Sequence, residues 1–148
     1  MCGLTGFWDF SARFSNEQLN NIVTNMANSI IYRGPDDGGA WTLEKEGLAM
    51  GHRRLSILDL TLAGKQPMHS HTGRFIVVYN GEVYNAPVLQ AELIKLGHTF
   101  NGHSDTEVIV QAFEEWGIEA SCKKFIGMFA IAVWDNKLEE LILIRDRL

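Results

Sequence analysis

Residues 127–146 constrain the fold most, because they read as two apolar strands joined by a short turn. The run GMFAIAVWD is followed by Asn136-Lys137 and then by LEELILIRD. Two β-branched or aromatic runs around turn residues are typical of an antiparallel β-hairpin. A further β-branched run, RFIVVY, ends at Asn80-Gly81, and more strands are expected in GLTGFWDF, AWTL and GLAMGHRRLSIL.

One helix is expected after the first strand. Ser15 is its predicted N-cap, and Gln18, three residues later, completes a capping box. Apolar residues recur behind it at helical spacing, at positions 19, 22, 23, 26 and 30. The segment RGPDDGG (33–39) is expected to break this helix and form a polar loop.

Two more helices are expected after Asn80-Gly81. Pro87 marks the start of the first, Leu89, Leu93 and Leu96 form its apolar face, and Gly97 is its expected stop. The next helix is expected to start near residues 104–105 and to end at 117. Residues 59–73 are expected to be irregular. The order of elements predicts an α/β (α+β) layered domain with mainly antiparallel sheets.

Composition excludes several classes of protein. The chain has 148 residues, enough for one domain, and its net charge of −5 contains no block of like charges that would indicate nucleic acid or an anionic membrane. No run is long enough to span a bilayer, and no signal peptide is recognisable. Two cysteines without Cys-x-x-Cys spacing argue against a disulfide scaffold or zinc site and favour the cytoplasm. His69 and His71 could share a metal, but no further ligand stands at useful spacing, so no metal is expected.

Cys2 is the candidate nucleophile. A free α-amine has a pKa of about 7.7–8.0, so a cysteine that becomes residue 1 after removal of Met1 carries its own general base. With Met1 attached, that nitrogen is an amide and cannot act as a base. Taken alone, a Met-Cys start is also compatible with an incidental cysteine.

Eight motifs that occur in order favour a nucleophilic Cys2 over an incidental one. They are MCGLTGF, RGPDDGG, HRRLSILD, QPM, YNGEVYN, HSDTEVI, GMFAIAVWD and IRDR. Together they resemble the N-terminal glutaminase domain of glutamine-hydrolysing asparagine synthetases, class II glutamine amidotransferases of the N-terminal-nucleophile type. The resemblance implies a four-layer αββα sandwich over residues 2–148. It also implies that the chain is a piece that stops before the glutaminase domain would finish.

The resemblance implies a catalytic role for three residues. Cys2 would attack the side-chain amide of glutamine and form a thioester that water hydrolyses to glutamate. Asn80, through its side-chain amide, and Gly81, through its backbone N–H, would form the oxyanion hole. The alternative for Asn80-Gly81 is a hairpin turn.

The resemblance also implies which residues bind the α-carboxylate and the α-ammonium group of glutamine. Arg54 would hold the α-carboxylate, beside the backbone of Leu55, Ser56, Ile57 and Leu58. Asp105 would take the α-ammonium group, with Glu82 nearby. The alternatives are a surface salt bridge for Arg54 and a helix N-cap for Asp105, and a helix-start carboxylate can fill both roles.

The motifs leave the ammonia acceptor open. A synthetase domain, with its ATP and Mg²⁺, is not found in this sequence, so only the glutaminase half-reaction is expected and no cofactor is implied for the chain itself. The expected ligand is L-glutamine and the expected partner a C-terminal synthetase domain. Alternatives are an amidotransferase of a surface-polysaccharide or amino-sugar pathway and a non-catalytic glutamine-binding fragment. The oligomeric state stays open, a homodimer included.

Overall fold

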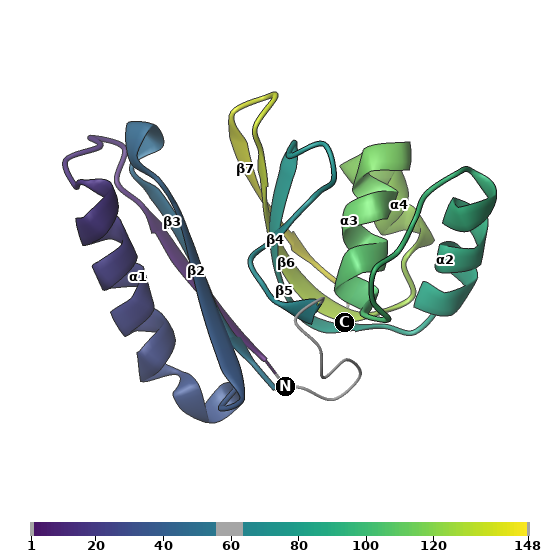
Figure 1. The fold of residues 1–148 in the computed structure, drawn as a ribbon, viewed down its shortest axis with the longest axis horizontal. Coiled ribbons are helices and arrows are strands. Elements are labelled where there is room, and N and C mark those ends of the chain that lie inside the picture. The colour runs from purple at the N-terminus through teal and green to yellow at the C-terminus, as the bar shows by residue number, and fades with distance from the viewer. Residues whose placement is uncertain (1, 56–63, 148) are drawn as a thin grey trace. The chain divides into compact units, whose positions relative to one another are not determined.

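The computed structural model describes residues 2–55 and 64–147, whose elements are labelled in Figure 1. In chain order the elements, with short 3₁₀ helices as η, are β1 (Gly3–Trp8), α1 (Asn16–Ser29), η1 (Ile31–Arg33), β2 (Asp37–Leu43), η2 (Glu44–Glu46), β3 (Leu48–Arg54), β4 (Met68–His69), β5 (Phe75–Val83), α2 (Ala86–Lys95), α3 (Asp105–Trp116), α4 (Ile118–Lys124), β6 (Gly127–Asp135) and β7 (Glu140–Arg145). None of the helices in these segments is long and apolar enough to cross a lipid bilayer.

The described residues form two compact units. The first consists of residues 2–55, 65–67 and 78–80, and the second of residue 64 with residues 68–77 and 81–147. Strand β5 therefore contributes its middle to the first unit and its two ends to the second.

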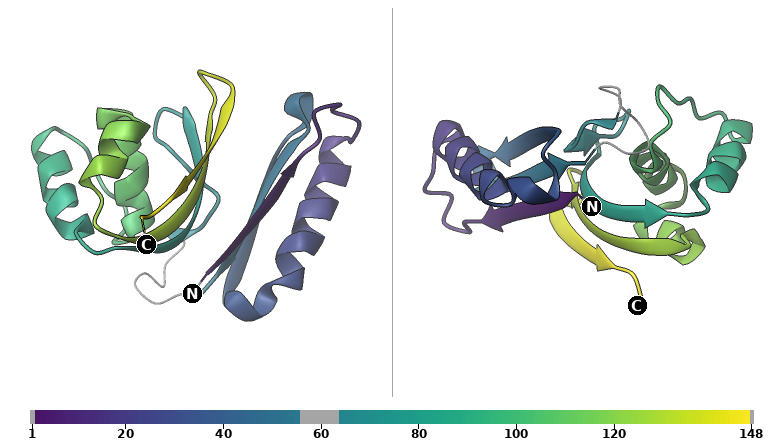
Figure 2. Two further views of the ribbon diagram at one scale, coloured as in Figure 1. Left: turned by 180° about the vertical axis from the view of Figure 1, so that it is seen from behind. Right: turned by 90° about the horizontal axis from the view of Figure 1, so that it is seen from below.

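The first unit is a helix on a three-stranded antiparallel sheet. The strand order is β1-β3-β2, and α1 runs along one face of this sheet (Figures 1 and 2). Leu19 and Val23 of α1 pack on Ala49 of β3, and all three are fully buried. Burying such side chains contributes about 1.5–3 kcal/mol each for the larger ones, which fixes the helix on the sheet.

The start of α1 confirms the predicted capping box. The Ser15 hydroxyl accepts the backbone N–H of Gln18, and the Gln18 side chain accepts the backbone N–H of Ser15 at 2.9 Å. Two of the amide hydrogens that a helix start leaves unpaired are thereby satisfied.

The position of Gly51 shows which side chains of β3 face helix α1 and which face the opposite side of the sheet. A Cβ on Gly51 would lie 3.0 Å from the Val23 side chain, so Gly51 faces α1. Because side chains alternate along a strand, His52 faces away from the helix, Arg53 toward it, and Arg54 away again.

The second unit is a four-stranded sheet with helices on one face. The strand order is β4-β5-β6-β7, and α2, α3 and α4 lie together on one side of it (Figure 1). Its core contains a chain of aromatic rings, Phe75–Phe113–Phe125–Phe129, with successive centroids 6.0 Å apart. The predicted β6–β7 hairpin is present, with Asp135 opposite Glu140 across the turn.

Two strand predictions are corrected. Strand β5 continues through Asn80 and Gly81 to Val83, so this dipeptide is no hairpin turn. Strand β2 begins at Asp37, so the expected polar loop keeps only its first residues. In both places pairing with a strand distant in sequence overrides a local turn signal.

One residue of the helical region differs from expectation: Leu96, predicted on the apolar face of α2, is 51% exposed at its C-cap. A short helix, α4, follows Gly117 and contains Cys122. The N-cap of α3 is Ser104, whose hydroxyl accepts the N–H of Glu107, so Asp105 is the first helical residue rather than the cap. The stretch expected to be irregular contains the two-residue strand β4.

The fold class is confirmed. The chain is a mixed α/β protein with antiparallel sheets, and each unit supplies one sheet and one helical layer.

Candidate functional site

The thiol of Cys2 lies against the backbone of Leu55. The Leu55 N–H donates to Cys2 Sγ at 3.4 Å, and the sulfur lies 3.8 Å from the Leu55 carbonyl oxygen. Cys2 is half-buried rather than sealed in the core. The sulfur is therefore held in place in a residue that is not fully buried.

The backbone of Cys2 has its own contact. Arg33, at the end of η1, donates from Nε to the Cys2 carbonyl oxygen at 3.1 Å. This hydrogen bond ties the residue before β1 to the end of η1. A side chain on Gly3 would collide with Ile30, its Cβ lying 2.7 Å from Ile30 Cδ1, so the space beside Gly3 is filled by the end of the α1 segment.

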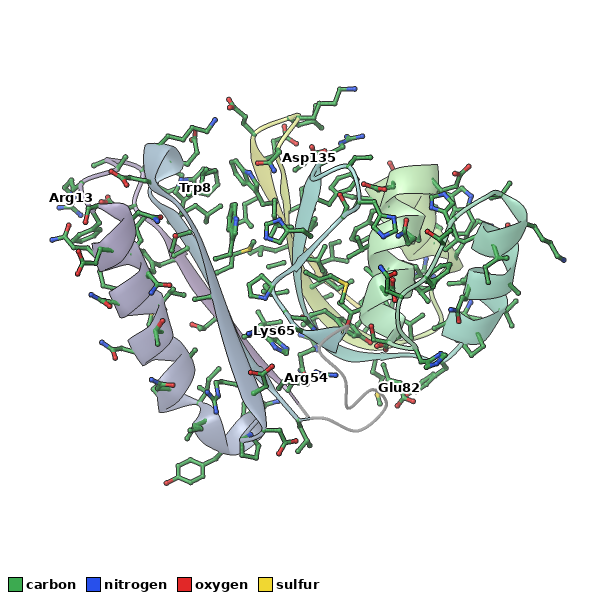
Figure 3. The ribbon with its side chains drawn as sticks, viewed as in Figure 1. Trp8, Arg13, Arg54, Lys65, Glu82 and Asp135 are labelled. Atoms are coloured by element: carbon green, nitrogen blue, oxygen red, sulfur yellow. The ribbon has the colours of Figure 1, made fainter. Side chains whose placement is uncertain are left out.

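Arg54 ends β3 at the same end of the sheet as Cys2, because Gly3 pairs with Arg53 in antiparallel register. Figure 3 shows Arg54 at this end of the strand. Its side chain faces away from α1, and the residue is 8% exposed. A buried guanidinium is costly unless it is paired, which makes this position more than a surface salt bridge.

The loop after η1 is fixed to the end of β3. Arg53 donates from Nε to the Gly34 carbonyl at 3.0 Å, and Asp36 donates its backbone N–H to the Arg54 carbonyl at 3.0 Å. A Cβ on Gly34 would lie 2.4 Å from the Arg53 backbone, so only glycine permits this close approach. Arg53 is thus a structural residue.

Asn80 follows a tightly held residue, Tyr79. Tyr79 donates its N–H to Gln66 Oε1 at 2.6 Å, and its carbonyl accepts from His52 Nε2 at 3.1 Å. Asn80 itself is half-buried, and within residues 2–55 and 64–147 its Oδ1 is a buried atom without a hydrogen-bond partner. Burial of the imidazole lowers the pKa of His52 to about 4, against the smaller opposing effect of the Tyr79 hydrogen bond.

Three further predicted residues lie in the second unit. Gly81 has φ +151°, and a Cβ there would lie 2.2 Å from the Met128 carbonyl. Glu82 follows with an exposed side chain. Asp105 Oδ2 accepts the Val83 N–H at 3.1 Å and so holds the start of α3 to the end of β5.

The structure thus brings the predicted residues together in two sets. Cys2, Arg54 and Leu55 lie at one end of the first sheet, in the unit that also contains Asn80. Gly81, Glu82 and Asp105 belong to the second unit. The predicted pocket residues Ser56, Ile57 and Leu58 lie outside the described residues.

His71 and Cys122 lie outside the candidate site. The ring nitrogens of His71 lie 3.1 and 3.2 Å from Gln111 Nε2. Across the described segments no three His, Cys, Asp or Glu side chains gather as metal ligands. Cys122 is a half-buried residue of α4, and burial raises the pKa of its thiol.

Comparison with known proteins places this arrangement in a family. The profile of the glutamine amidotransferase domain matches residues 1–148. The chain belongs to this family. Among relatives of the domain, asparagine synthetase [glutamine-hydrolyzing] 2 of Bacillus subtilis is 45% identical over 147 residues, covering 99% of this chain and 19% of that protein. Asparagine synthetase [glutamine-hydrolyzing] 3 of the same organism is 38% identical over 151 residues, covering 100% and 24%.

A solved structure also resembles the glutamine amidotransferase domain. Glutamine phosphoribosylpyrophosphate amidotransferase from B. subtilis, complexed with ADP and GMP, superposes with a TM-score of 0.57 at 25% identity, covering 68% of this chain and 23% of that chain. The domain is therefore homologous to glutamine-hydrolysing asparagine synthetases, and it spans about a fifth to a quarter of the length of the relatives it matches.

Proposed function

We propose that this glutamine amidotransferase domain hydrolyses L-glutamine to glutamate and ammonia through a thioester on Cys2. The sulfur attacks the side-chain amide carbon and forms a tetrahedral intermediate. Its collapse breaks the C–N bond and releases ammonia, which leaves with a proton. Water then adds to the thioester, and the C–S bond breaks to give glutamate and the free thiol.

The proton transfers are assigned to the α-amine of Cys2 after removal of Met1. This amine takes the thiol proton and returns it to the leaving nitrogen. Asn80 Nδ2 and the Gly81 N–H are the proposed donors to the oxyanion. Such donors typically contribute about 10²–10³ each in rate.

Recognition of free glutamine is assigned to one cation and two anions. Arg54 binds the α-carboxylate as a fork, next to the backbone of Leu55 and the three residues that follow it. Asp105 and Glu82 bind the α-ammonium group. The hydrogen bond from Val83 to Asp105 orients that carboxylate and leaves it acceptor capacity for a ligand.

One observation carries the proposal: the sulfur of a half-buried cysteine contacts the backbone that follows a buried arginine, inside a glutamine amidotransferase domain. A structural cysteine would be expected in an apolar interior instead. The continuation of β5 through Asn80 and Gly81 adds support, because it removes the hairpin alternative for this dipeptide.

The ammonia is proposed to serve ATP-dependent amide formation, as in asparagine biosynthesis, by a synthetase domain that these residues do not include. The names of the relatives support this acceptor over a sugar or another carboxylate. A cytoplasmic location is proposed on the same ground and on the free cysteines.

Two cysteine variants test the nucleophile. Cys2→Ala is expected to lower glutamate release by more than about 10³-fold. Cys122→Ala is the matched control, a half-buried cysteine of the second unit, and is expected to keep the wild-type rate. Mass spectrometry of wild type should show loss of one methionine and, after 6-diazo-5-oxo-norleucine, an adduct on Cys2 alone.

Calorimetric titration with glutamine separates turnover from binding. A folded, processed wild type that binds glutamine but releases no glutamate would make the domain a sensing module and overturn the proposal. Equal loss of activity in both cysteine variants would also contradict it.

A further inference from the structure

The backbone of Tyr79 lies on the edge of β5 that strand β4 covers further along. Within the described residues, β4 pairs with β5 at Ile76 and Val77 and ends before it reaches Tyr79. Ser70, just beyond β4, donates its N–H to the Phe75 carbonyl at 2.9 Å, which shows that the odd-numbered residues of β5 turn their backbone groups toward β4. Tyr79 therefore presents its N–H and carbonyl at the same edge.

Continuing the β4 register would place residue 66 opposite Tyr79, because Met68 pairs with Val77. The backbone of Gln66 does not take that place. Its carbonyl lies against β2, where a Cβ on Gly39 would be 2.0 Å from Gln66 O. Pro67, which follows, has no N–H to donate to a ladder.

Two side chains bond the Tyr79 peptide groups beyond the end of β4. Gln66 Oε1 accepts the Tyr79 N–H at 2.6 Å, and His52 Nε2 lies 3.1 Å from the Tyr79 carbonyl. Because a carbonyl only accepts, the imidazole carries its proton on Nε2 and donates it. The peptide groups of Tyr79 are thus held from both sides by side chains.

Both side chains are rigidly placed. Gln66 is 5% exposed and His52 is 1% exposed, and Tyr79 is buried as well. His52 is fixed by the β3 ladder, where it pairs with Leu4 on one side and Gly39 on the other. The hydrogen bonds are therefore shielded from water, and losing either would remove a hydrogen bond from a buried peptide group.

We propose that Gln66 and His52 are positioning residues that hold Tyr79 and thereby aim Asn80 as an oxyanion donor. This inference rests on the proposed function, because it takes Asn80 as that donor. Asn80 is bonded directly to the Tyr79 carbonyl carbon, so a rotation of the Tyr79 peptide moves the Asn80 side chain with it. A donor must lie within about 0.2 Å of its ideal distance to stabilise the developing charge fully.

Disruptive and conservative variants exist for each residue. Gln66→Met keeps the length of the side chain and removes the acceptor, whereas Gln66→Glu keeps an acceptor oxygen at the same reach. His52→Leu removes the donor, whereas His52→Gln keeps a side-chain N–H near the position of Nε2. Ser121→Ala is the matched control, since it removes a buried side-chain hydrogen bond, 2.8 Å to the Ala112 carbonyl, in the second unit.

The measurements separate ground-state binding from stabilisation of the oxyanion. Gln66→Met and His52→Leu are expected to lower kcat by about 10- to 100-fold with KM for glutamine within about threefold. Their affinity for L-glutamic γ-semialdehyde, whose thiohemiacetal oxygen occupies the oxyanion position, is expected to fall by a similar factor. Gln66→Glu and His52→Gln should recover most of both quantities, and Ser121→Ala should change neither.

Different results overturn different claims. An inactive wild type contradicts the proposed function before any variant is made. An active wild type whose Gln66→Met and His52→Leu variants keep both kcat and aldehyde affinity contradicts the positioning role and leaves the function standing. Losses that also appear in Ser121→Ala, in step with lowered melting temperature, would make the effect one of stability and overturn the inference. If one disruptive variant does not fold, the other decides the outcome.

Discussion

Leu55 donates its backbone N–H to the sulfur of Cys2 at 3.4 Å, across 53 positions of sequence. The contact links the residue that precedes β1 to the residue that follows β3. It holds the side chain of the proposed nucleophile by a main-chain donor, which no side-chain substitution at position 55 removes except proline.

Leu55→Pro is therefore expected to reduce kcat for glutamine hydrolysis by about tenfold relative to Leu55→Ala, which retains the N–H. Steady-state assays of both variants, with their melting temperatures, provide the check. Equal kcat values in two folded variants would show that the N–H to sulfur contact has no part in the reaction.

Arg54→Lys is expected to raise KM for glutamine by about 10- to 100-fold with little change in kcat. Lysine keeps the charge but loses the planar fork that binds a carboxylate through two hydrogen bonds. Arg53→Lys gives the comparison, because Arg53 contacts the Gly34 carbonyl on the other face of the sheet. A larger rise of KM in Arg53→Lys than in Arg54→Lys would reverse the assignment.

Gly81→Ala is expected to destabilise the domain by about 2–4 kcal/mol. The residue has φ +151°, and an added Cβ would meet the Met128 carbonyl at 2.2 Å, so strain and overlap both contribute. Gly73→Ala has a positive φ of 73° with no atom within 4 Å of the new Cβ, and it should cost only about 1 kcal/mol. Urea unfolding measures both, and equal losses would rule out the overlap with β6.

Stability should fall as pH is lowered from 6.5 toward 4, and His52 should account for part of the loss. Its pKa is about 4 in the folded chain and about 6.5 when unfolded, so the unfolded chain binds the extra proton in this window. Between pH 6.5 and 5 this contributes about 1.6 kcal/mol to the decrease in unfolding free energy. Nearby Arg54 and Arg53 act in the same direction as burial, and Asp37 opposes them.

His52→Gln removes the titrating group, so its unfolding free energy should depend less steeply on pH over that range. His98 shifts the other way, since its hydrogen bond to Glu115 raises its pKa, and it contributes equally to both proteins. Parallel pH profiles for wild type and His52→Gln would mean that His52 is already protonated in the native state.

Local signals predicted the helices well because their determinants lie within a few residues of each other. The capping box of Ser15 and Gln18 and the stop at Gly97 are examples. The strand through Asn80 and Gly81 could not be predicted, because its extended form depends on pairing within the sheet rather than on the turn propensity of Asn-Gly.

The same division holds for the candidate site. Cys2 and Arg54 were named from short motifs, and β1–β3 pairing brings them to one end of a sheet. The contacts made by Arg33, His52 and Gln66 were not predicted as such, since each joins residues 13 to 31 positions apart that carry no shared local pattern.

The pairing of Gly3 with Arg53 means that the position of the proposed nucleophile depends on the number of residues in β1 and β3. One residue inserted within β1 or β3 would shift the strand register and turn the side chains beyond it to the opposite face of the sheet. The Cys2 sulfur and the Arg54 guanidinium would then no longer lie close together. The connections at the far end of these strands, 9–15 and 44–47, carry no such penalty. Evolution and engineering can therefore lengthen those two turns, whereas the lengths of β1 and β3 must stay unchanged.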